Sequence, residues 1–277
     1  MASNSANTAF AVNTYSYTLR APARQCLQSL ARRGFREFEL MMYPGHLWPA
    51  ELDAAQRREL KDYIDGEGLT IRTINMPNVD LNVAAATSEM REMTLGLLRR
   101  FVALAGDLGA QGVVLGPGKA NPLLPMPRQQ MVEHFYQALN QLVPVAAAHG
   151  TALFVENMPF AFLPQAAELL AVLDQYGDPN IGMVYDVANG HFIKEDVGAA
   201  LRLCAKRLQV VHLSDTTHSV YRHDAVGLGT VDFSVVPPAL REIGFKRRPI
   251  LEIIDSDPDN SIEHSVRQLQ AAGWPTA

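Results

Sequence analysis

Two cysteines, a net charge of −5 and the lack of any long apolar run limit what this chain of 277 residues can be. Cys26 and Cys204 fall in separate predicted helices and do not have the spacing of a disulfide framework, which indicates a reducing compartment. Residues 1–8 are small and polar, without a basic region followed by an apolar core, so no signal peptide is expected. No run approaches the length of a membrane span, so no membrane partner and a cytoplasmic location are expected.

The charge balance also bears on the partners of this protein. With 24 Lys and Arg against 29 Asp and Glu, the chain has no general attraction for nucleic acid or for an anionic surface. Hydrophobic residues make up 48% of the sequence, which is enough for one substantial core. No shift of composition marks a boundary, so residues 1–277 are predicted to form a single domain.

Four short apolar runs each carry one chemically active side chain at or near the C-terminal end. Runs of this kind are typical of fully buried parallel strands. The four active residues are 30, 26 and 40 positions apart, which fits successive strand–helix units. The runs are Ala152–Glu156, Gly182–Asp186, Leu208–His212 and Pro249–Ile253, and their active residues are Glu156, Asp186, His212 and Glu252.

The rest of the chain repeats the same alternation. Eight predicted strands alternate with about eight predicted helices, and the third strand runs into the loop Met76–Asp80. This number of strictly alternating units predicts the α/β class and a single (β/α)8 TIM barrel. The predicted strands are 9–17, 38–42, 70–75, 112–115, 152–156, 182–186, 208–212 and 249–253. The predicted helices are 21–33, 52–67, 88–108, 128–149, 163–176, 197–205, 234–243 and 261–272.

The four active residues would meet at one end of such a barrel. Barrel enzymes build their active sites at the C-terminal ends of the strands. One polar residue at a strand end is often held by a loop amide or an Arg. Two Glu, one Asp and one His at successive strand ends instead favour a divalent metal site. Glu252 carries most weight, because it lies between Leu251 and Ile253, and a buried carboxylate needs a cation or dense hydrogen bonding.

These motifs resemble the xylose-isomerase-like TIM-barrel superfamily of sugar (phosphate) isomerases and epimerases, which also includes the zinc AP endonucleases. In the ketose epimerases of this group, the residues that match the four active positions bind one divalent cation. The resemblance implies Mn²⁺, with Mg²⁺, Co²⁺ or Zn²⁺ as alternatives, and makes Glu156 and Glu252 the acid/base pair. It is carried by Val155–Asn157, Tyr185–Asn189, Val211–Asp215, Leu251–Ile253 and His223–Asp232, the last similar to the loop His-x-x-x-Gly-x-Gly-x-[Ile/Val]-Asp.

The resemblance implies isomerisation or epimerisation of a small polyhydroxylated carbonyl substrate, a ketose or ketose phosphate. The reaction would pass through a metal-stabilised enediolate, with one carboxylate removing a proton and the other returning it. Many relatives have His where this chain has Asn189, and His191 could replace it. Arg222 is the candidate for an Arg that follows the metal-binding His. The expected substrate-binding residues are Asn157, Asn189, His191, Arg222 and His223.

Three other functions stay open on the sequence. A lyase of the 3-dehydroshikimate dehydratase type could use the same cation and base. An AP endonuclease-like nuclease is disfavoured, because Tyr221 stands where its signature has Asp and the His46 loop is an ambiguous source of a further ligand. A non-catalytic sugar-binding barrel is the third alternative, and a homo-oligomer is also left open.

Overall fold

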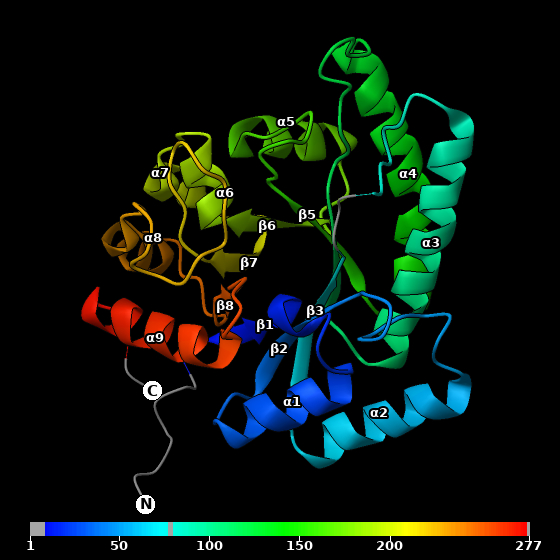
Figure 1. Ribbon diagram of the computed structural model, residues 1–277. Helices are drawn as coiled ribbons and strands as arrows, with labels where there is room; N and C mark the ends of the chain where they lie inside the picture. Colours follow the sequence, from blue (N-terminus) through cyan, green and yellow to red (C-terminus); the bar gives the residue numbers. More distant parts are fainter. Residues whose placement is uncertain (1–8, 77–79, 276–277) are drawn as a thin grey trace, which may run out of the picture.

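The eight strands of this protein close into one parallel barrel, seen in a computed structural model that describes residues 9–76 and 80–275 (Figure 1). The strands follow one another in sequence order around the barrel, and β8 pairs with β1. The prediction of an α/β fold with a single (β/α)8 TIM barrel is confirmed. Residues 1–8 and 276–277 of the predicted domain, and Pro77–Val79 of the predicted loop, lie outside the described residues.

Four strands have the bounds that the sequence predicts, and the first strand does not. The chain leaves β1 after Asn13 and enters a 3-10 helix, η2 (Tyr15–Tyr17), because the Asn13 side chain accepts the backbone N–H of Tyr15 at 2.6 Å. The strands are β1 Ala11–Asn13, β2 Glu37–Met41, β3 Thr70–Asn75, β4 Gly112–Leu115, β5 Ala152–Glu156, β6 Gly182–Asp186, β7 Leu208–Leu213 and β8 Ile250–Leu251.

Helices cover the outside of the barrel (Figure 1). The short helix α6 (Val187–Phe192) is not predicted from the sequence; it begins directly after β6, with Asp186 as its N-cap. The predicted helix 234–243 is divided between a 3-10 helix, η3 (Phe233–Val235), and α8 (Val236–Glu242). The others are α1 Ala23–Arg32, α2 Ala54–Gly66, α3 Ser88–Asp107, α4 Arg128–Ala148, α5 Ala166–Tyr176, α7 Val197–Leu203 and α9 Pro258–Ala271.

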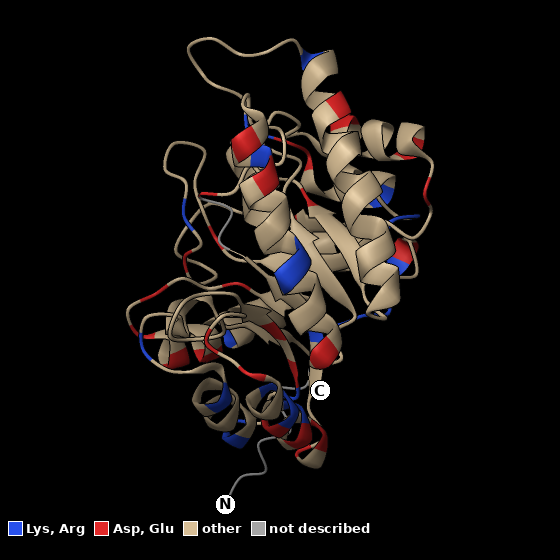
Figure 2. Ribbon diagram, turned by 90° about the vertical axis from the view of Figure 1, so that its right-hand side faces the viewer, with Lys and Arg blue, Asp and Glu red and all other residues tan. Residues whose placement is uncertain are grey.

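The surface and the cysteines agree with the composition. Figure 2 views the molecule from the side of α3 and α4 and shows acidic and basic positions interspersed along the helices. Cys26 and Cys204 are both free, which agrees with the expected lack of a disulfide framework, and both are buried. Among the described residues, none of the helices has both the length and the apolar character needed to span a bilayer.

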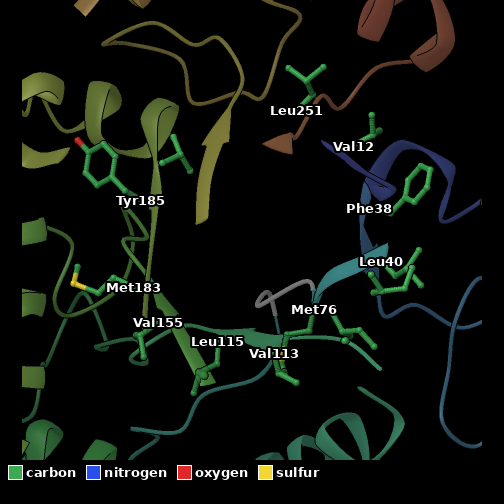
Figure 3. Close-up of a cluster of buried hydrophobic side chains, with 14 of the residues drawn as sticks. Val12, Phe38, Leu40, Met76, Val113, Leu115, Val155, Met183, Tyr185 and Leu251 are labelled. Carbon is green, nitrogen blue, oxygen red and sulfur yellow. The ribbon is translucent and has the colours of Figure 1, made fainter. Parts of the chain in front are cut away.

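Strand side chains alternate between the helices and the barrel interior. The labelled side chains in Figure 3, among them Val12, Val155 and Leu251, point away from the barrel axis into the main core. A smaller apolar cluster fills the interior of the barrel. Its buried members are Ala11, Val114, Phe154, Val184, Val210 and Ile250.

Phe154 occupies the floor of the barrel between two glycines. A Cβ atom added at Gly112 would lie within 3 Å of the Phe154 ring, and one at Gly182 would lie 2.6 Å from the same ring. The glycines therefore make room for an aromatic ring inside the barrel.

The residue two positions after an interior residue also points inward, because strand side chains alternate with a period of two. The next interior layer, toward the carboxyl ends of the strands, therefore consists of the residues two positions after the members of the interior apolar cluster. In this chain the layer is polar, since Asn13, Glu156, Asp186, His212 and Glu252 each follow a member of the interior cluster by two positions.

Candidate metal centre

The four predicted ligands come together in this polar layer. Nδ1 of His212 lies 3.1 Å from Oε1 of Glu156, 3.2 Å from Oε2 of Glu252 and 3.7 Å from Oδ2 of Asp186. One ligand atom from each of the four residues lies within 4.8 Å of the others, and all four side chains are buried. β6 and β7 place Asp186 directly opposite His212 in the strand register.

Asp186 has one satisfied oxygen and one unsatisfied oxygen. Oδ1 accepts the backbone N–H of Asn189 at 2.7 Å, which caps α6. Oδ2 is buried and has no hydrogen-bond partner in the described part of the chain. The Asn157 side chain holds the backbone of Asp186 on both sides, accepting its N–H at 2.7 Å and donating to its carbonyl at 3.1 Å. A buried carboxylate oxygen without a donor is a costly arrangement that a cation would relieve.

Burial and charged neighbours shift the pKa values of the clustered side chains. Burial raises the pKa of Glu156 to about 8 and that of Asp186 to about 6. Burial alone would lower the pKa of His212, but the carboxylates of Glu39 and Glu252 raise it well above its usual value. Burial opposes ionisation of Glu252 as well, yet the charge of His212 lowers the pKa of Glu252 to about 2. Protons on Glu156 and His212 therefore limit the repulsion, and a divalent cation would replace them.

The cluster fits one divalent cation. Carboxylate oxygens and an imidazole nitrogen are ligands for Mn²⁺, Mg²⁺, Co²⁺ and Zn²⁺, so the donor set does not select among these ions. The unsatisfied Oδ2 of Asp186 lies on the side of His212, 3.7 Å from its Nδ1. Glu156, Asp186, His212 and Glu252 are the residues that could hold the ion.

Sequence reasoning missed Glu39, a fully buried carboxylate on β2. Its Oε1 lies 3.0 Å from Nε2 of His212, on the side of the ring away from the cluster. The signal was present, because Glu39 interrupts the apolar run Phe38–Met42 in the same way that Glu252 interrupts its own run.

A pocket of about 340 Å³ opens above the cluster. Glu156 and Glu252 line this pocket, whereas Asp186 and His212 are fully buried and do not. Most of the wall is apolar, and much of it comes from loops that follow the strands. The apolar and aromatic lining residues are Tyr15, Met41, Met76, Leu81, Met158, Pro159, Phe160, Ala161, Tyr221 and Ile254.

Two of the predicted substrate-binding residues line the pocket. Nδ1 of His223 lies 3.4 Å from Oε2 of Glu252 and 3.0 Å from the hydroxyl of Ser214. The hydroxyl of Tyr221 donates to Oδ1 of Asn189 at 2.7 Å and lies 2.9 Å from Nε2 of His223. Tyr221 therefore joins Asn189 and His223 into one hydrogen-bonded edge of the pocket, a role that the sequence did not reveal.

The other three predicted substrate-binding residues lie outside the pocket lining. Asn157 is fully buried behind Asp186. His191 stacks on His218 with ring centroids 4.1 Å apart, and its Nε2 lies 2.8 Å from the Thr230 hydroxyl. Arg222 is exposed, with its guanidinium 4.0 Å from Asp224.

His46 does not join the cluster either. Its Nε2 lies 2.9 Å from the hydroxyl of Thr14, and its Nδ1 lies 2.6 Å from the carbonyl oxygen of Ala21. Both ring nitrogens are thus engaged within the N-terminal part of the barrel.

A closed eight-stranded barrel with a buried Glu, Asp, His and Glu cluster at the carboxyl ends of its strands defines a TIM-barrel protein with a candidate metal centre. Residues 27–272 match the model of the xylose isomerase-like TIM barrel family, and the chain belongs to that family.

Individual relatives agree with this assignment. An L-ribulose 3-epimerase from Mesorhizobium japonicum is 25% identical over 84% of this chain and 77% of that protein. The crystal structure of a D-tagatose 3-epimerase-like protein has a TM-score of 0.80 and 20% identity, over 95% of this chain and 96% of the other. The IOLI protein, solved with a bound zinc atom, has a TM-score of 0.77 and 17% identity, over the same shares of the two chains.

Proposed function

We propose that this protein is a divalent-metal-dependent epimerase or isomerase of a small polyhydroxylated carbonyl compound, a ketose or ketose phosphate. The observation that carries the proposal is that two of the four clustered side chains reach the pocket and two do not. Glu156 and Glu252 line the pocket, while Asp186 and His212 lie beneath them. The two glutamates are therefore the members of the cluster that a bound substrate would contact.

Glu156, Asp186, His212 and Glu252 would hold one divalent cation, and Mn²⁺ is the proposed ion. Bound there, the cation would supply a Lewis acid that polarises the substrate carbonyl and offsets the negative charge left when the neighbouring carbon loses its proton.

The two glutamates would transfer the proton. One takes it from the substrate carbon and the other returns a proton from the opposite side, which inverts the configuration of that carbon. Their positions suit this role, because Glu156 belongs to β5, Glu252 follows β8, and two further strands lie between them around the barrel. The similarity to an L-ribulose 3-epimerase supports the same reaction class.

The apolar wall would exclude water from the reacting carbon and pack against the faces of the sugar that present C–H groups. Met158, Phe160 and Tyr221 lie on this wall, and the rings of Phe160 and Tyr221 meet edge to face with centroids 5.3 Å apart. Asn189 and His223 provide polar groups at one edge, where they would orient the hydroxyl groups of the substrate.

Metal analysis of the purified protein, followed by a sugar screen in D₂O with added Mn²⁺, tests the proposal. The screen uses ketoses, ketose phosphates and keto-inositols, with chelator-treated protein as the control. Deuterium that enters the carbon beside the carbonyl without loss of water, together with an epimeric or isomeric product, is the expected result. Loss of water with a conjugated ultraviolet-absorbing product would instead assign a 3-dehydroshikimate dehydratase type of lyase. Cleavage of abasic DNA would assign a nuclease, and sugar binding without exchange or metal would assign a non-catalytic barrel.

A further inference from the structure

Glu39 faces His212 from the side opposite the other three candidate metal ligands. Its carboxylate is fully buried on β2, with Oε1 3.0 Å from Nε2 of the imidazole. The other ring nitrogen, Nδ1, faces Glu156 and Glu252. The imidazole therefore lies between Glu39 on one side and the cluster on the other.

The surroundings of Glu39 supply donors. The Asn13 amide donates to Oε1 at 2.5 Å, the Asn75 amide donates to Oε1 at 3.2 Å, and the Thr73 hydroxyl donates to Oε2 at 2.6 Å. These donors come from β1 and β3, the strands on either side of β2. They hold the carboxylate in place beside the imidazole, and its two oxygens have about four acceptor sites, of which these donors use three.

His212 needs such an acceptor. An imidazole that binds a cation through one nitrogen carries its proton on the other nitrogen, and a buried N–H without a partner is costly. In the described part of the chain, Nε2 of His212 is buried and has no aligned hydrogen bond. Glu39 is the carboxylate within reach of it.

We infer that Glu39 is a positioning residue of the metal centre, which accepts the Nε2–H of His212 and fixes the ring with Nδ1 toward Glu156, Asp186 and Glu252. The inference rests on the metal site of the proposed function. Glu39 touches neither the ion nor the substrate in this arrangement and acts through His212.

The same support reaches a second ligand. The Asn13 amide that donates to Glu39 also donates to Oε1 of Glu252 at 3.1 Å. Asn13 and Glu39 are paired in the register of β1 and β2. The pair therefore links His212 and Glu252 through the interior of the barrel.

Metal titration of two Glu39 variants tests the inference. Glu39→Gln keeps the size of the side chain and removes its charge, and Glu39→Ala removes the acceptor. We expect the Kd for Mn²⁺, measured by calorimetry on metal-free protein, to rise about 10- to 100-fold in Glu39→Gln and further in Glu39→Ala. Glu195→Gln is the matched control, because Glu195 is a partly buried carboxylate that accepts from Ala166 N–H and the Tyr185 hydroxyl, neither of which belongs to the cluster.

A purely structural role for Glu39 gives a different result. It would lower the thermal unfolding temperature of the metal-free Glu39→Gln protein and leave its Kd within about twofold of the wild-type value, which would overturn the inference. The expected result is a raised Kd, while the unfolding temperature of the metal-free variant stays close to that of Glu195→Gln.

A second measurement needs no variant. Nitrogen-15 NMR of the histidine rings in the Zn²⁺-loaded wild-type protein reports which nitrogen of His212 is protonated. Zn²⁺ on Nδ1 with a proton on Nε2 is expected, and the reverse arrangement would overturn the inference even if the variants fail to fold. Failure of the proposed function would give a different result. If the wild-type protein bound Mn²⁺ but exchanged no sugar proton, only the proposed function would be refuted. Wild-type protein that binds no divalent ion removes both.

Discussion

The backbone N–H of Asn189 donates to Oδ1 of Asp186 at 2.7 Å, and Oδ2 of the same carboxylate stays buried without a partner among the described residues. Asp186 therefore caps α6 through one oxygen and offers the other to the cluster. Asp and Asn cap helices about equally well. Substitutions at this position can consequently separate the stability of the fold from the affinity for a cation.

Asp186→Asn is expected to keep the stability and lose the metal. The amide oxygen still caps α6, while the negative charge and the unsatisfied carboxylate oxygen disappear. We expect Mn²⁺ affinity to fall more than about 100-fold, beyond the range for a residue that only supports a ligand. In the metal-free proteins, the free energy of unfolding of Asp186→Asn should exceed that of Asp186→Ala by about 1 kcal/mol, the value of the cap. Urea unfolding measures this, and a less stable Asp186→Asn would contradict the capping role.

The response to pH follows from the raised pKa values of Glu156 and His212. Between its unfolded pKa of 4.5 and its folded pKa of about 8, Glu156 keeps a proton in the folded protein that the unfolded chain has released. Its contribution to the stability of the fold therefore falls as the pH rises through this interval. His212, whose folded pKa is also raised, likewise loses its stabilising contribution as the pH rises through that pKa. The metal-free protein should therefore become less stable from about pH 6.5 to pH 8.

A bound cation reverses this trend. Since it replaces those protons, its affinity should increase over the same interval. The rise in unfolding temperature on adding Mn²⁺ is thus expected to be larger near pH 8 than near pH 6, as scanning fluorimetry would measure. Calorimetry in buffers of different ionisation enthalpy should detect proton release on binding at the lower pH. An equal temperature shift at both pH values, without proton release, would refute the idea that the cation replaces protons on Glu156 and His212.

If two glutamates transfer the proton, replacing either one should affect the two epimers of the substrate differently. Glu156→Gln and Glu252→Gln should each reduce epimerisation by about 10²- to 10⁴-fold, because each removes the acid or base on one side of the substrate. Glu195→Gln, a carboxylate outside the cluster, should retain activity. In D₂O, each cluster variant should still exchange the proton of the epimer that its remaining glutamate faces, and proton NMR would follow this. If one variant abolished exchange of both epimers and the other of neither, a single base would act.

Gly112→Ala should destabilise the barrel. The Phe154 ring already contacts Gly182 on its other side, so it cannot move away from a Cβ at position 112. Overpacking of this kind costs about 1–3 kcal/mol. Chemical denaturation would measure the loss, and Phe154→Leu in the same chain should recover part of it. Additive effects of the two substitutions would show that the ring is not the obstacle.

The sequence predicted the four candidate ligands because strand geometry is local, although it missed Glu39 on β2. A short buried run fixes which side chains point inward, and four runs with their active residues were enough to place Glu156, Asp186, His212 and Glu252 together. The first strand was predicted too long, since the turn after Asn13 depends on a side chain that captures the N–H of Tyr15 rather than on hydropathy.

The part of the site beyond the strands was predicted only in part, because loop paths depend on tertiary contacts. Asn189 and His223 were expected to bind substrate and do line the pocket, whereas Tyr221 was missed. Asp215 and Asp224 form an antiparallel bridge that folds the loop after β7 back on itself. Alternate residues of an extended segment face opposite sides. Tyr221 and His223 therefore line the pocket, while Arg222 between them is exposed.

The ligand cluster stands at the ends of strands, whereas much of the pocket wall is carried by loops such as Met158–Ala161. The barrel can thus be retargeted by exchanging a loop, since the strands keep the carboxylates and the imidazole at fixed positions. A library randomised at Met158 and Phe160 would test whether the pocket takes new ligands while the four candidate metal ligands stay in place.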